Sequence, residues 1–142
     1  MKIYLDNCCF NRPFDDQTQL KIHLESQAKL FIQQQIISQE YGLVWSFILE
    51  YENMHNPYEI RKNTIIKWKD LASDIIMQNE EIIKFAERLY IKGINTKDAL
   101  HVACAVMSGC DYFITTDKKL SNLKLEEIKI CNPIDFIIEM EV

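Results

Sequence analysis

Four acidic residues stand at points of the chain where a divalent cation could be bound. Asp6 and Asp117 each directly follow a short apolar run that is typical of a buried strand. Asp98 falls in the first turn of an apolar helical segment, and Glu52 lies on the helix expected after a second strand. Carboxylates and water are the ligands that Mg²⁺ and Mn²⁺ prefer. If the four acids converge, they predict a metal centre that hydrolyses phosphodiesters with metal-activated water.

Each of these acids also has a purely structural explanation. Asp6 could complete a turn after a strand, Asp98 could complement a helix dipole, and Asp117 could begin a short helix. Glu52 could be solvated, as most glutamates are. Glu50 competes with Glu52, because residues two apart on a helix point in nearly opposite directions and only one should reach the cluster. The joint placement of the acids, and no single residue, favours a site.

The elements that must position these acids follow from the spacing of apolar residues. Short apolar runs predict four strands, at 3–5, 43–45, 112–114 and 128–130. Helical spacing predicts helices at 16–40, from Ser46 to the stop at Asn56–Pro57, at 59–77, 80–91, 97–107 and 134–140. The apolar residues that mark 16–40 as amphipathic are Leu20, Leu24, Ala28, Phe31 and Ile32. Short apolar strands separated by helices predict a three-layer α/β/α sandwich with a short parallel central sheet.

Length and composition exclude several classes of protein. The 142 residues predict one domain, 1–142, and only 3 Gly and 3 Pro argue against an all-β protein. With 16 basic and 21 acidic residues the net charge is −5, which disfavours a protein that holds nucleic acid by bulk positive charge. No apolar run approaches the roughly 20 residues of a membrane span, and the start does not resemble a signal peptide.

The cysteines predict a reduced environment. Their number, 5, is odd, and no Cys-x-x-Cys pair is present, so neither a disulfide framework nor a structural zinc site is expected. We therefore expect a cytoplasmic protein.

Four short motifs, taken together, resemble those of PIN-domain proteins. They have the order and intervals of that family and span essentially the whole chain: IYLD at 3–6, SFILEYE at 46–52, KDALHVA at 97–103 and FITTD at 113–117. Many stand-alone bacterial PIN proteins are VapC-type toxins. The segment NCCFNRPFD at 7–15 resembles one subgroup of PIN proteins and departs from the commonest toxins.

The resemblance implies a metal-dependent endoribonuclease with Mg²⁺ or Mn²⁺ as its cofactor. Asp6, Asp98 and Asp117 match the acidic positions of the family and would bind the metal. The family's remaining catalytic acid falls six residues after the Ser of the second motif, which favours Glu52 over Glu50.

Three further residues are candidates to support this site. Thr115 matches the family's hydroxyl residue two positions before the last acid, where it would orient a carboxylate or water. Asn7 stands where many members have Ser or Thr, and its amide could make a similar hydrogen bond. His101 lies three residues after Asp98 on the same helical face, so it either supports the metal site or is a buried, hydrogen-bonded histidine.

Contacts with RNA have weaker candidates. Trp68, between two lysines, is a better candidate than Trp45 to stack on bases, although a helix facing a partner would explain it equally well. Charged residues that flank the proposed site and could contact phosphates are Arg12, Lys118 and Lys119.

The resemblance also implies partners, and other functions stay open. RNA is the expected substrate, a VapC-type toxin implies an antitoxin, and homodimers are common in the family. One alternative is a non-catalytic interaction module on the PIN fold, with the helices at 59–91 binding a partner. Another is a different Mg²⁺-dependent phosphotransfer or phosphatase enzyme. Phosphatases of that kind need a second Asp two residues after the first, where this chain has Cys8.

Overall fold

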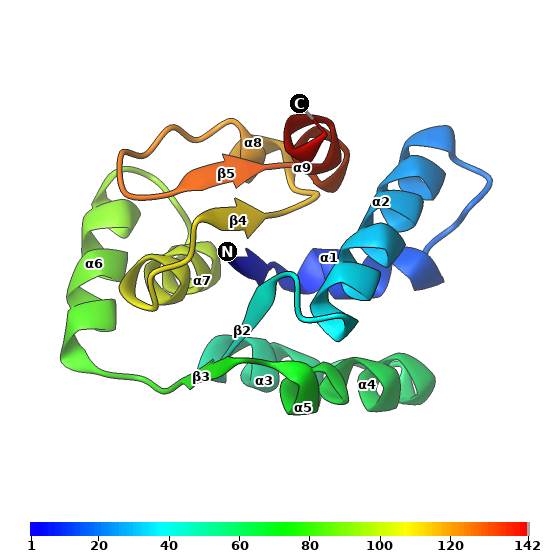
Figure 1. Ribbon diagram of the computed structural model, residues 1–142. Helices are drawn as coiled ribbons and strands as arrows, with labels where there is room; N and C mark the ends of the chain where they lie inside the picture. Colours follow the sequence, from blue (N-terminus) through cyan, green and yellow to red (C-terminus); the bar gives the residue numbers. More distant parts are fainter. Residues whose placement is uncertain (142) are drawn as a thin grey trace.

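The computed structural model describes residues 1–141, in which five parallel strands form a central sheet (Figure 1). The strands are β1 (Lys2–Leu5), β2 (Gly42–Ser46), β3 (Asp74–Ile76), β4 (Tyr112–Ile114) and β5 (Lys129–Cys131). Their order across the sheet is β3-β2-β1-β4-β5. Ile3 of β1 pairs with Leu43 of β2 and with Tyr112 of β4. The first strand of the chain therefore lies in the middle of the sheet, which is why Ile3, Tyr4 and Leu5 are fully buried.

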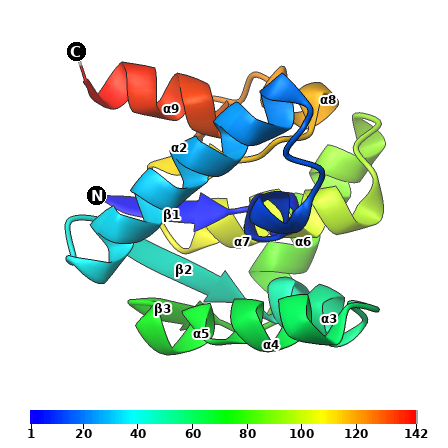
Figure 2. The same cartoon turned by 90° about the vertical axis from the view of Figure 1, so that its right-hand side faces the viewer.

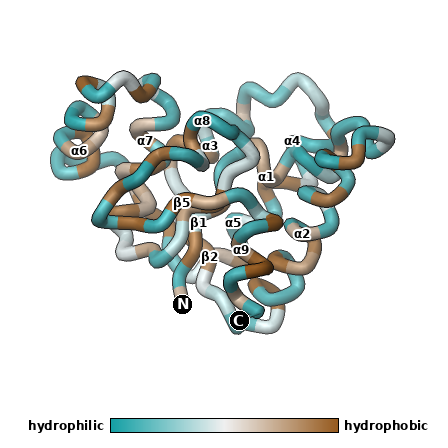
Figure 3. Tube along the Cα trace, turned by 90° about the horizontal axis from the view of Figure 1, so that it is seen from above, coloured by the Kyte–Doolittle hydropathy of each residue, from teal (hydrophilic) through white to brown (hydrophobic). Residues whose placement is uncertain are grey.

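Helices cover both faces of the sheet and complete the predicted three-layer sandwich. They are α1 (Asn7–Asn11), α2 (Leu20–Ile37), α3 (Phe47–Met54), α4 (Glu59–Ile66), α5 (Trp68–Leu71), α6 (Glu80–Ile91), α7 (Thr96–Met107), α8 (Lys118–Ser121) and α9 (Pro133–Met140), with a 3₁₀ turn, η1 (Arg12–Phe14). Figures 1 and 3 show α6 and α7 on one face and α2 and α9 on the other. The α/β/α prediction is confirmed, because each parallel connection must cross a face of the sheet through helical segments.

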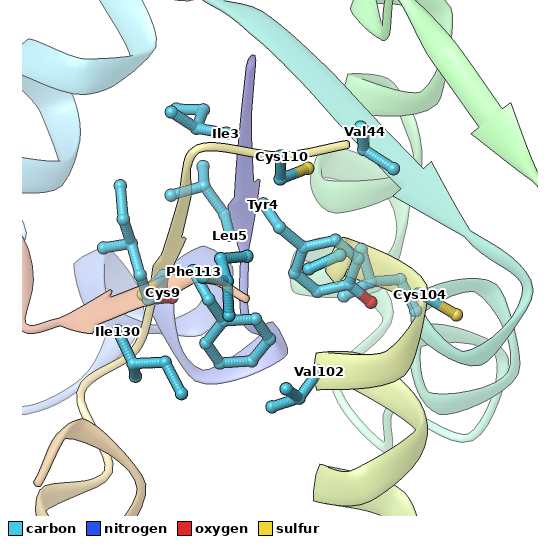
Figure 4. Close-up of a cluster of buried hydrophobic side chains, with 14 of the residues drawn as sticks. Ile3, Tyr4, Leu5, Cys9, Val44, Val102, Cys104, Cys110, Phe113 and Ile130 are labelled. Carbon is cyan, nitrogen blue, oxygen red and sulfur yellow. The ribbon is translucent and has the colours of Figure 1, made fainter. Parts of the chain in front are cut away.

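The core joins the middle of the sheet to α7. Tyr4 and Leu5 are fully buried, and the Tyr4 ring stacks on Phe113 of β4 with centroids 5.2 Å apart (Figure 4). Val102 and Cys104 of α7 pack against this group from the opposing helix. Burial of each large apolar side chain contributes roughly 1.5–3 kcal/mol. Residues 101–105 of α7 are all buried, so this helix is enclosed on several sides.

The predicted helix at 59–77 is wrong at its C-terminal end. The segment instead forms α4 and α5 and then β3, which pairs with the edge of β2. The backbone amide of Ser73 donates to the carbonyl of Leu43 at 2.9 Å, and Asp74 forms a 2.7 Å ion pair with Lys2 of the central strand. Pairing with β2 overrides the local helical pattern here, as tertiary context often does for β-branched residues such as Ile75.

The helix predicted at 16–40 is shorter and turned differently from what its apolar spacing suggests. Of the residues that mark it as amphipathic, Leu20, Leu24 and Phe31 are exposed. The face turned to the protein carries Ile32 and Ile36 and also, unusually, three polar residues: Glu25, Ser26 and Lys29.

A buried ion pair explains this orientation of α2. The Nε of Arg12 in η1 donates to Oε1 of Glu25 at 3.0 Å, and Asn132, the N-cap of α9, donates to the other Glu25 oxygen. Ser26 adds a hydrogen bond to the main-chain oxygen of Arg12 at 3.0 Å. Because a buried carboxylate needs such partners, this network decides which face of α2 is buried.

Two other sequence-based expectations bear on the environment of the protein. No helix within the described part of the chain is long and apolar enough to cross a membrane. All five cysteines are free thiols in the structure.

Candidate active site

The carboxyl ends of β1, β2 and β4 meet at one edge of the sheet and bring the predicted acids to it. Figure 2 shows the arrow of β1 running into α1 and that of β2 pointing toward α3. Asp6 follows β1, Thr115 to Asp117 follow β4, and Glu52 lies on α3 after β2. The N-terminus of α7, with Asp98 in its first turn, reaches the same neighbourhood. In open parallel sheets this edge is where ligands bind.

Asp6 is almost completely buried, with 7% of its surface exposed, at the junction of β1 and α1. Its carboxylate accepts the backbone amide of Asn7 at 2.8 Å and so forms the N-cap of α1, a helix that the sequence did not predict. Its own amide donates to the carbonyl of Ile114 in β4 at 2.9 Å. The backbone thus holds the carboxylate at the sheet edge.

Thr115 connects the first and last acids of the cluster. Its hydroxyl, fully buried, donates to Oδ2 of Asp6 at 2.8 Å and accepts the backbone amide of Asp117 at 3.1 Å. The carboxylate of Asp117 in turn accepts the amide of Leu120 and caps α8. Asp117 therefore caps α8, and the Thr115 hydroxyl links its backbone amide, not its carboxylate, to Asp6.

Glu52 is bound by His101, which reaches it from α7. His101 Nε2 hydrogen-bonds to Oε1 of Glu52 and lies 3.8 Å from Oδ1 of Asp6. The Nδ2 of Asn7 donates to the other oxygen of Glu52 at 3.4 Å. Burial alone would lower the pKa of His101, but the hydrogen bond to Glu52 and the charge of Asp6 raise it above its ordinary value. His101 is thus both buried and in contact with the acids.

A chain of buried hydrogen bonds holds His101 from behind. The hydroxyl of Tyr4 lies 2.6 Å from Nδ1 of His101 and 2.6 Å from the hydroxyl of Ser46. The sequence did not suggest Tyr4 as a candidate for the site. Two signals could have pointed to it: residues two apart on a strand share a face, which puts Tyr4 beside Asp6, and a buried tyrosine hydroxyl needs a partner.

The acids influence one another electrostatically. Burial, reinforced by the negative charges of Asp6 and Asp117, raises the pKa of Asp98. For Glu52 burial acts in the same direction, but the hydrogen bond and charge of His101 outweigh it and lower the pKa. A bound cation would stabilise the ionised form of carboxylates whose pKa is raised by neighbouring negative charges.

The donor chemistry of the cluster fits a hard divalent cation, although the side chains do not converge on one point. Among residues 1–141, no group of three or more His, Cys, Asp or Glu side chains is arranged to hold a metal ion. Asp98 is turned toward its N-cap, because Nδ2 of Asn95 donates to Oδ2 of Asp98 at 2.8 Å. Coordination by three acids would therefore require side chains such as that of Asp98 to turn.

Several other candidates lie elsewhere. Glu50 forms a 2.6 Å ion pair with Lys69 of α5, so it does not share the environment of Glu52. Trp68 is buried, with 9% of its surface exposed, near Phe10, so it offers no free face for stacking on RNA and that interpretation is wrong. Arg12 is engaged by Glu25 and Asp15. Lys118 and Lys119 are exposed beside Asp117.

Cys8 also contacts the cluster, although the sequence did not suggest it as a site residue. Its Sγ lies 3.4 Å from Oγ1 of Thr115 and 3.5 Å from Oδ2 of Asp6, and it accepts the amide of Thr116 at 3.3 Å. Position 8 follows Asp6 by two residues and falls in the first turn of α1, a helix whose existence the sequence did not reveal.

Comparisons with known proteins find similarity in structure. No family model and no curated protein matches the chain. The crystal structure of VapBC2 from Rickettsia felis bound to a DNA fragment from their promoter matches with a TM-score of 0.58 and 13% identity, covering 93% of this chain and 98% of that one.

Two further solved structures match to a similar extent. FitAcB from Neisseria gonorrhoeae matches with a TM-score of 0.57 and 16% identity, covering 92% of this chain and 97% of that one. VapBC-1 from nontypeable Haemophilus influenzae matches with a TM-score of 0.59 and 15% identity, covering 94% and 98%. Nearly the whole length of both chains superimposes in each pair, so this chain has the PIN-like fold of these VapBC structures.

Proposed function

We propose that this protein is the ribonuclease toxin of a VapBC-type pair and hydrolyses RNA with Mg²⁺ or Mn²⁺ bound at the carboxyl edge of the sheet. The observation that carries the proposal is the link through Thr115, which joins Asp6 to Asp117. Thr115 bonds the carboxylate of Asp6 and the backbone amide of Asp117, and both acids are near enough to Asp98 for their charges to raise its pKa, so the site would gain from a cation.

The proposed role of each residue follows from the groups that it contacts. Asp6, Asp98 and Asp117 would hold the cation through carboxylate oxygens. The hydroxyl of Thr115 and the backbone amide of Asn7 fix the Asp6 carboxylate in one orientation. A divalent cation there would lower the pKa of an attacking water and stabilise charge on the phosphoryl group and the leaving oxygen.

Glu52 is proposed as the fourth acid of the reaction. His101 holds one of its oxygens, which leaves Oε2 with the weak 3.4 Å contact from Asn7. That oxygen is available to orient a water or to accept its proton. Because the pKa of Glu52 is lowered, the carboxylate is ionised at neutral pH, as a proton acceptor must be.

The antitoxin partner is proposed from the same likeness. Two of the matched structures are described as VapBC2 and VapBC-1, and the first of these as bound to a DNA fragment from their promoter. An antitoxin segment that inserts an Arg or Lys among the acids would complement their charge and block the cation. RNA as substrate, a homodimer and a cytoplasmic location belong to the proposal as well.

Single substitutions test the activity. Asp6→Asn, Asp98→Asn and Asp117→Asn should each lower Mn²⁺-dependent cleavage of single-stranded RNA by more than about 100-fold, since even residues that only support metal ligands commonly contribute 10–100-fold. Asp70→Asn, an exposed acid on α5, is the matched control and should keep full activity. Full activity in two of the three site variants, or undiminished cleavage in EDTA, would contradict the proposal. No Mn²⁺ binding and no cleavage by the wild type would favour the non-catalytic interaction module.

A further inference from the structure

A pocket of about 270 Å³ has Glu52 in its lining, and Asp6, Asp98 and Asp117 do not line it. It lies between α1 and the turn that joins α3 to α4, elements that pack side by side (Figure 2). Its lining is mostly polar and includes the amide side chains of Asn7, Asn11 and Asn56. None of the roles described above uses Asn11 or Asn56.

The three amides form a hydrogen-bonded ladder that starts at Glu52. Asn7 donates to Oε2 of Glu52 at 3.4 Å, Asn11 donates to the main-chain oxygen of Asn7 at 3.1 Å, and Asn56 donates to Oδ1 of Asn11 at 3.3 Å. A side-chain amide has two donor hydrogens and an oxygen with two acceptor sites. The ladder fixes the orientation of each amide and leaves donors and acceptors for a ligand.

An aromatic ring at the mouth of the pocket is held in place and left exposed. Tyr58 is 58% exposed, and the guanidinium of Arg61 lies 4.5 Å from the centre of its ring. Arg61 is itself fixed by Asp15 at 3.3 Å and by the carbonyl of Phe14 at 2.8 Å. The ring is therefore supported by α4 through Arg61 and free to stack on a flat ligand.

The charges and polarity of the pocket disfavour phosphates and apolar side chains as ligands. The positive charge of Arg61 is largely neutralised by Asp15, and Glu52 adds a negative charge at the inner end. The charged groups of the lining therefore offer no net positive charge to a phosphate. Because amides line the wall, an apolar side chain would leave them without partners, which is unfavourable. A neutral, planar ligand rich in hydrogen-bonding groups fits both conditions.

We propose that this pocket binds one unstacked base of a single-stranded RNA, beside the phosphodiester that the acids cleave. Amide side chains read the edges of bases through paired donor and acceptor groups, and single-stranded RNA is recognised by bases that stack on aromatic rings. The pocket would give cleavage its base preference. The inference rests on the proposed ribonuclease function, because it names the substrate contact of that same site.

Binding can be measured without catalysis. In EDTA, the wild-type protein is titrated with adenosine, guanosine, cytidine and uridine at millimolar concentrations, and the side-chain amide resonances are followed by NMR. We expect one nucleoside to bind more tightly than the rest and to shift the amide resonances of Asn11 and Asn56. Asn11→Ala, Asn56→Ala and Tyr58→Ala should each weaken its binding by roughly 5–100-fold, the value of one base contact or one stacked ring.

Matched controls separate the pocket from general effects. Asn63→Ala removes an exposed amide from α4, and Tyr90→Ala removes a ring of similar exposure (61%) from α6. Both should bind the nucleoside as the wild type does. Thermal unfolding followed by circular dichroism identifies any variant that fails to fold, and Asn56→Asp, which changes the donor to an acceptor with little change of shape, then tests the pocket.

The outcomes distinguish this inference from the proposed function. If nucleosides bind and the three variants weaken them while the wild type cleaves no RNA, the pocket is supported and the ribonuclease proposal fails. If the wild type cleaves RNA but binds no nucleoside, or if the variants cleave a randomised RNA with unchanged base preference, the pocket inference is overturned. Loss of antitoxin binding in the Tyr58 and Asn56 variants, without nucleoside binding in the wild type, also overturns it in favour of a protein partner.

Discussion

Individual residues in this protein serve the fold and the candidate site at once. The hydroxyl of Tyr4 bridges Ser46 of β2 and His101 of α7, deep in the core, and His101 carries that constraint to Glu52. Asp6 caps α1 while its carboxylate remains at the sheet edge. Residues with such double contacts orient a site because a rotation at the site would break hydrogen bonds in the core.

Lys29 is a charged residue in an unusually buried environment. It lies on the buried face of α2 with 3% of its surface exposed, and its Nζ lies 5.4 Å from the ring centre of Phe10 and 5.2 Å from that of Trp68. Burial lowers the pKa of Lys29 from 10.5 to about 7. The folded protein therefore releases this proton at a lower pH than the unfolded chain does.

The depressed pKa of Lys29 predicts a pH dependence of stability. Above about pH 7 the unfolded chain binds more protons at this position than the folded protein, so the free energy of unfolding should rise with pH, by at most about 1.4 kcal/mol per pH unit. We expect the free energy of unfolding, measured in urea, to rise more steeply between pH 7 and 8.5 in the wild type than in Lys29→Met. The variant should also be the more stable of the two at pH 6.

The comparison with Lys29→Met separates Lys29 from other groups that titrate. His101, whose pKa is raised, lowers the free energy of unfolding as pH rises above the ordinary pKa of histidine, and it does so in both proteins, so the prediction concerns the difference between their slopes. Burial raises the pKa of Cys104 to about 12 and of Cys131 to about 12, so these thiols oppose the trend once the unfolded thiols ionise, above roughly pH 8.5. Lys21→Met, at an exposed position of the same helix, should keep the wild-type slope. Equal slopes in the wild type and Lys29→Met would contradict the prediction.

At the scale of elements, α2 shows that hydrogen bonds can decide how an amphipathic helix is turned. Its buried face combines Ile32 and Ile36 with Glu25, which binds Arg12 of η1 and Asn132 at the start of α9. Leu20 and Leu24 face outward. The buried carboxylate of Glu25 thus joins α2 to η1 and to the start of α9.

The orientation of α2 predicts opposite effects of substitution on its two faces. Leu20→Gln and Leu24→Gln, at positions 71% and 46% exposed, should change the free energy of unfolding by no more than about 0.5 kcal/mol. Ile32→Ala, at a fully buried position, should lower it by about 2–5 kcal/mol. Chemical denaturation measures all three. A loss above about 2 kcal/mol for Leu24→Gln would mean that α2 buries its leucine stripe, contrary to the structure.

At the scale of the whole molecule, the sheet gathers negative charge at its carboxyl edge. The protein has a net charge of −5, and four of its acids come to this edge from separate segments. Their mutual effect is visible in Asp98, whose pKa burial and the charges of Asp6 and Asp117 raise. A protein of this kind need not attract RNA by bulk charge if bound cations neutralise the acids where RNA approaches.

This arrangement predicts that Mn²⁺ stabilises the folded protein. A cation that binds only the folded state, at a hundred times its dissociation constant, adds about 2.7 kcal/mol to the free energy of unfolding. Thermal unfolding should therefore shift upward when Mn²⁺ replaces EDTA. Asp98→Asn should be at least as stable as the wild type in EDTA, because it removes a charge that burial and its neighbours disfavour, and should gain little from Mn²⁺.

Asp70→Asn is the control for the metal experiment, since it removes a charge from the exposed surface of α5. It should gain as much stability from Mn²⁺ as the wild type. An equal gain in Asp98→Asn would show that the cation binds elsewhere.

The sequence by itself determined the three-layer class, four of the five strands, and the positions of Asp6 and Asp117 at strand ends. These features follow from local periodicity and from the rule that parallel strands end at one edge. Only the tertiary structure decided that β3 joins the sheet, that α2 buries Glu25, and that Glu52 meets His101. Each of these depends on hydrogen bonds between residues far apart in the chain, which no local pattern of apolar residues encodes.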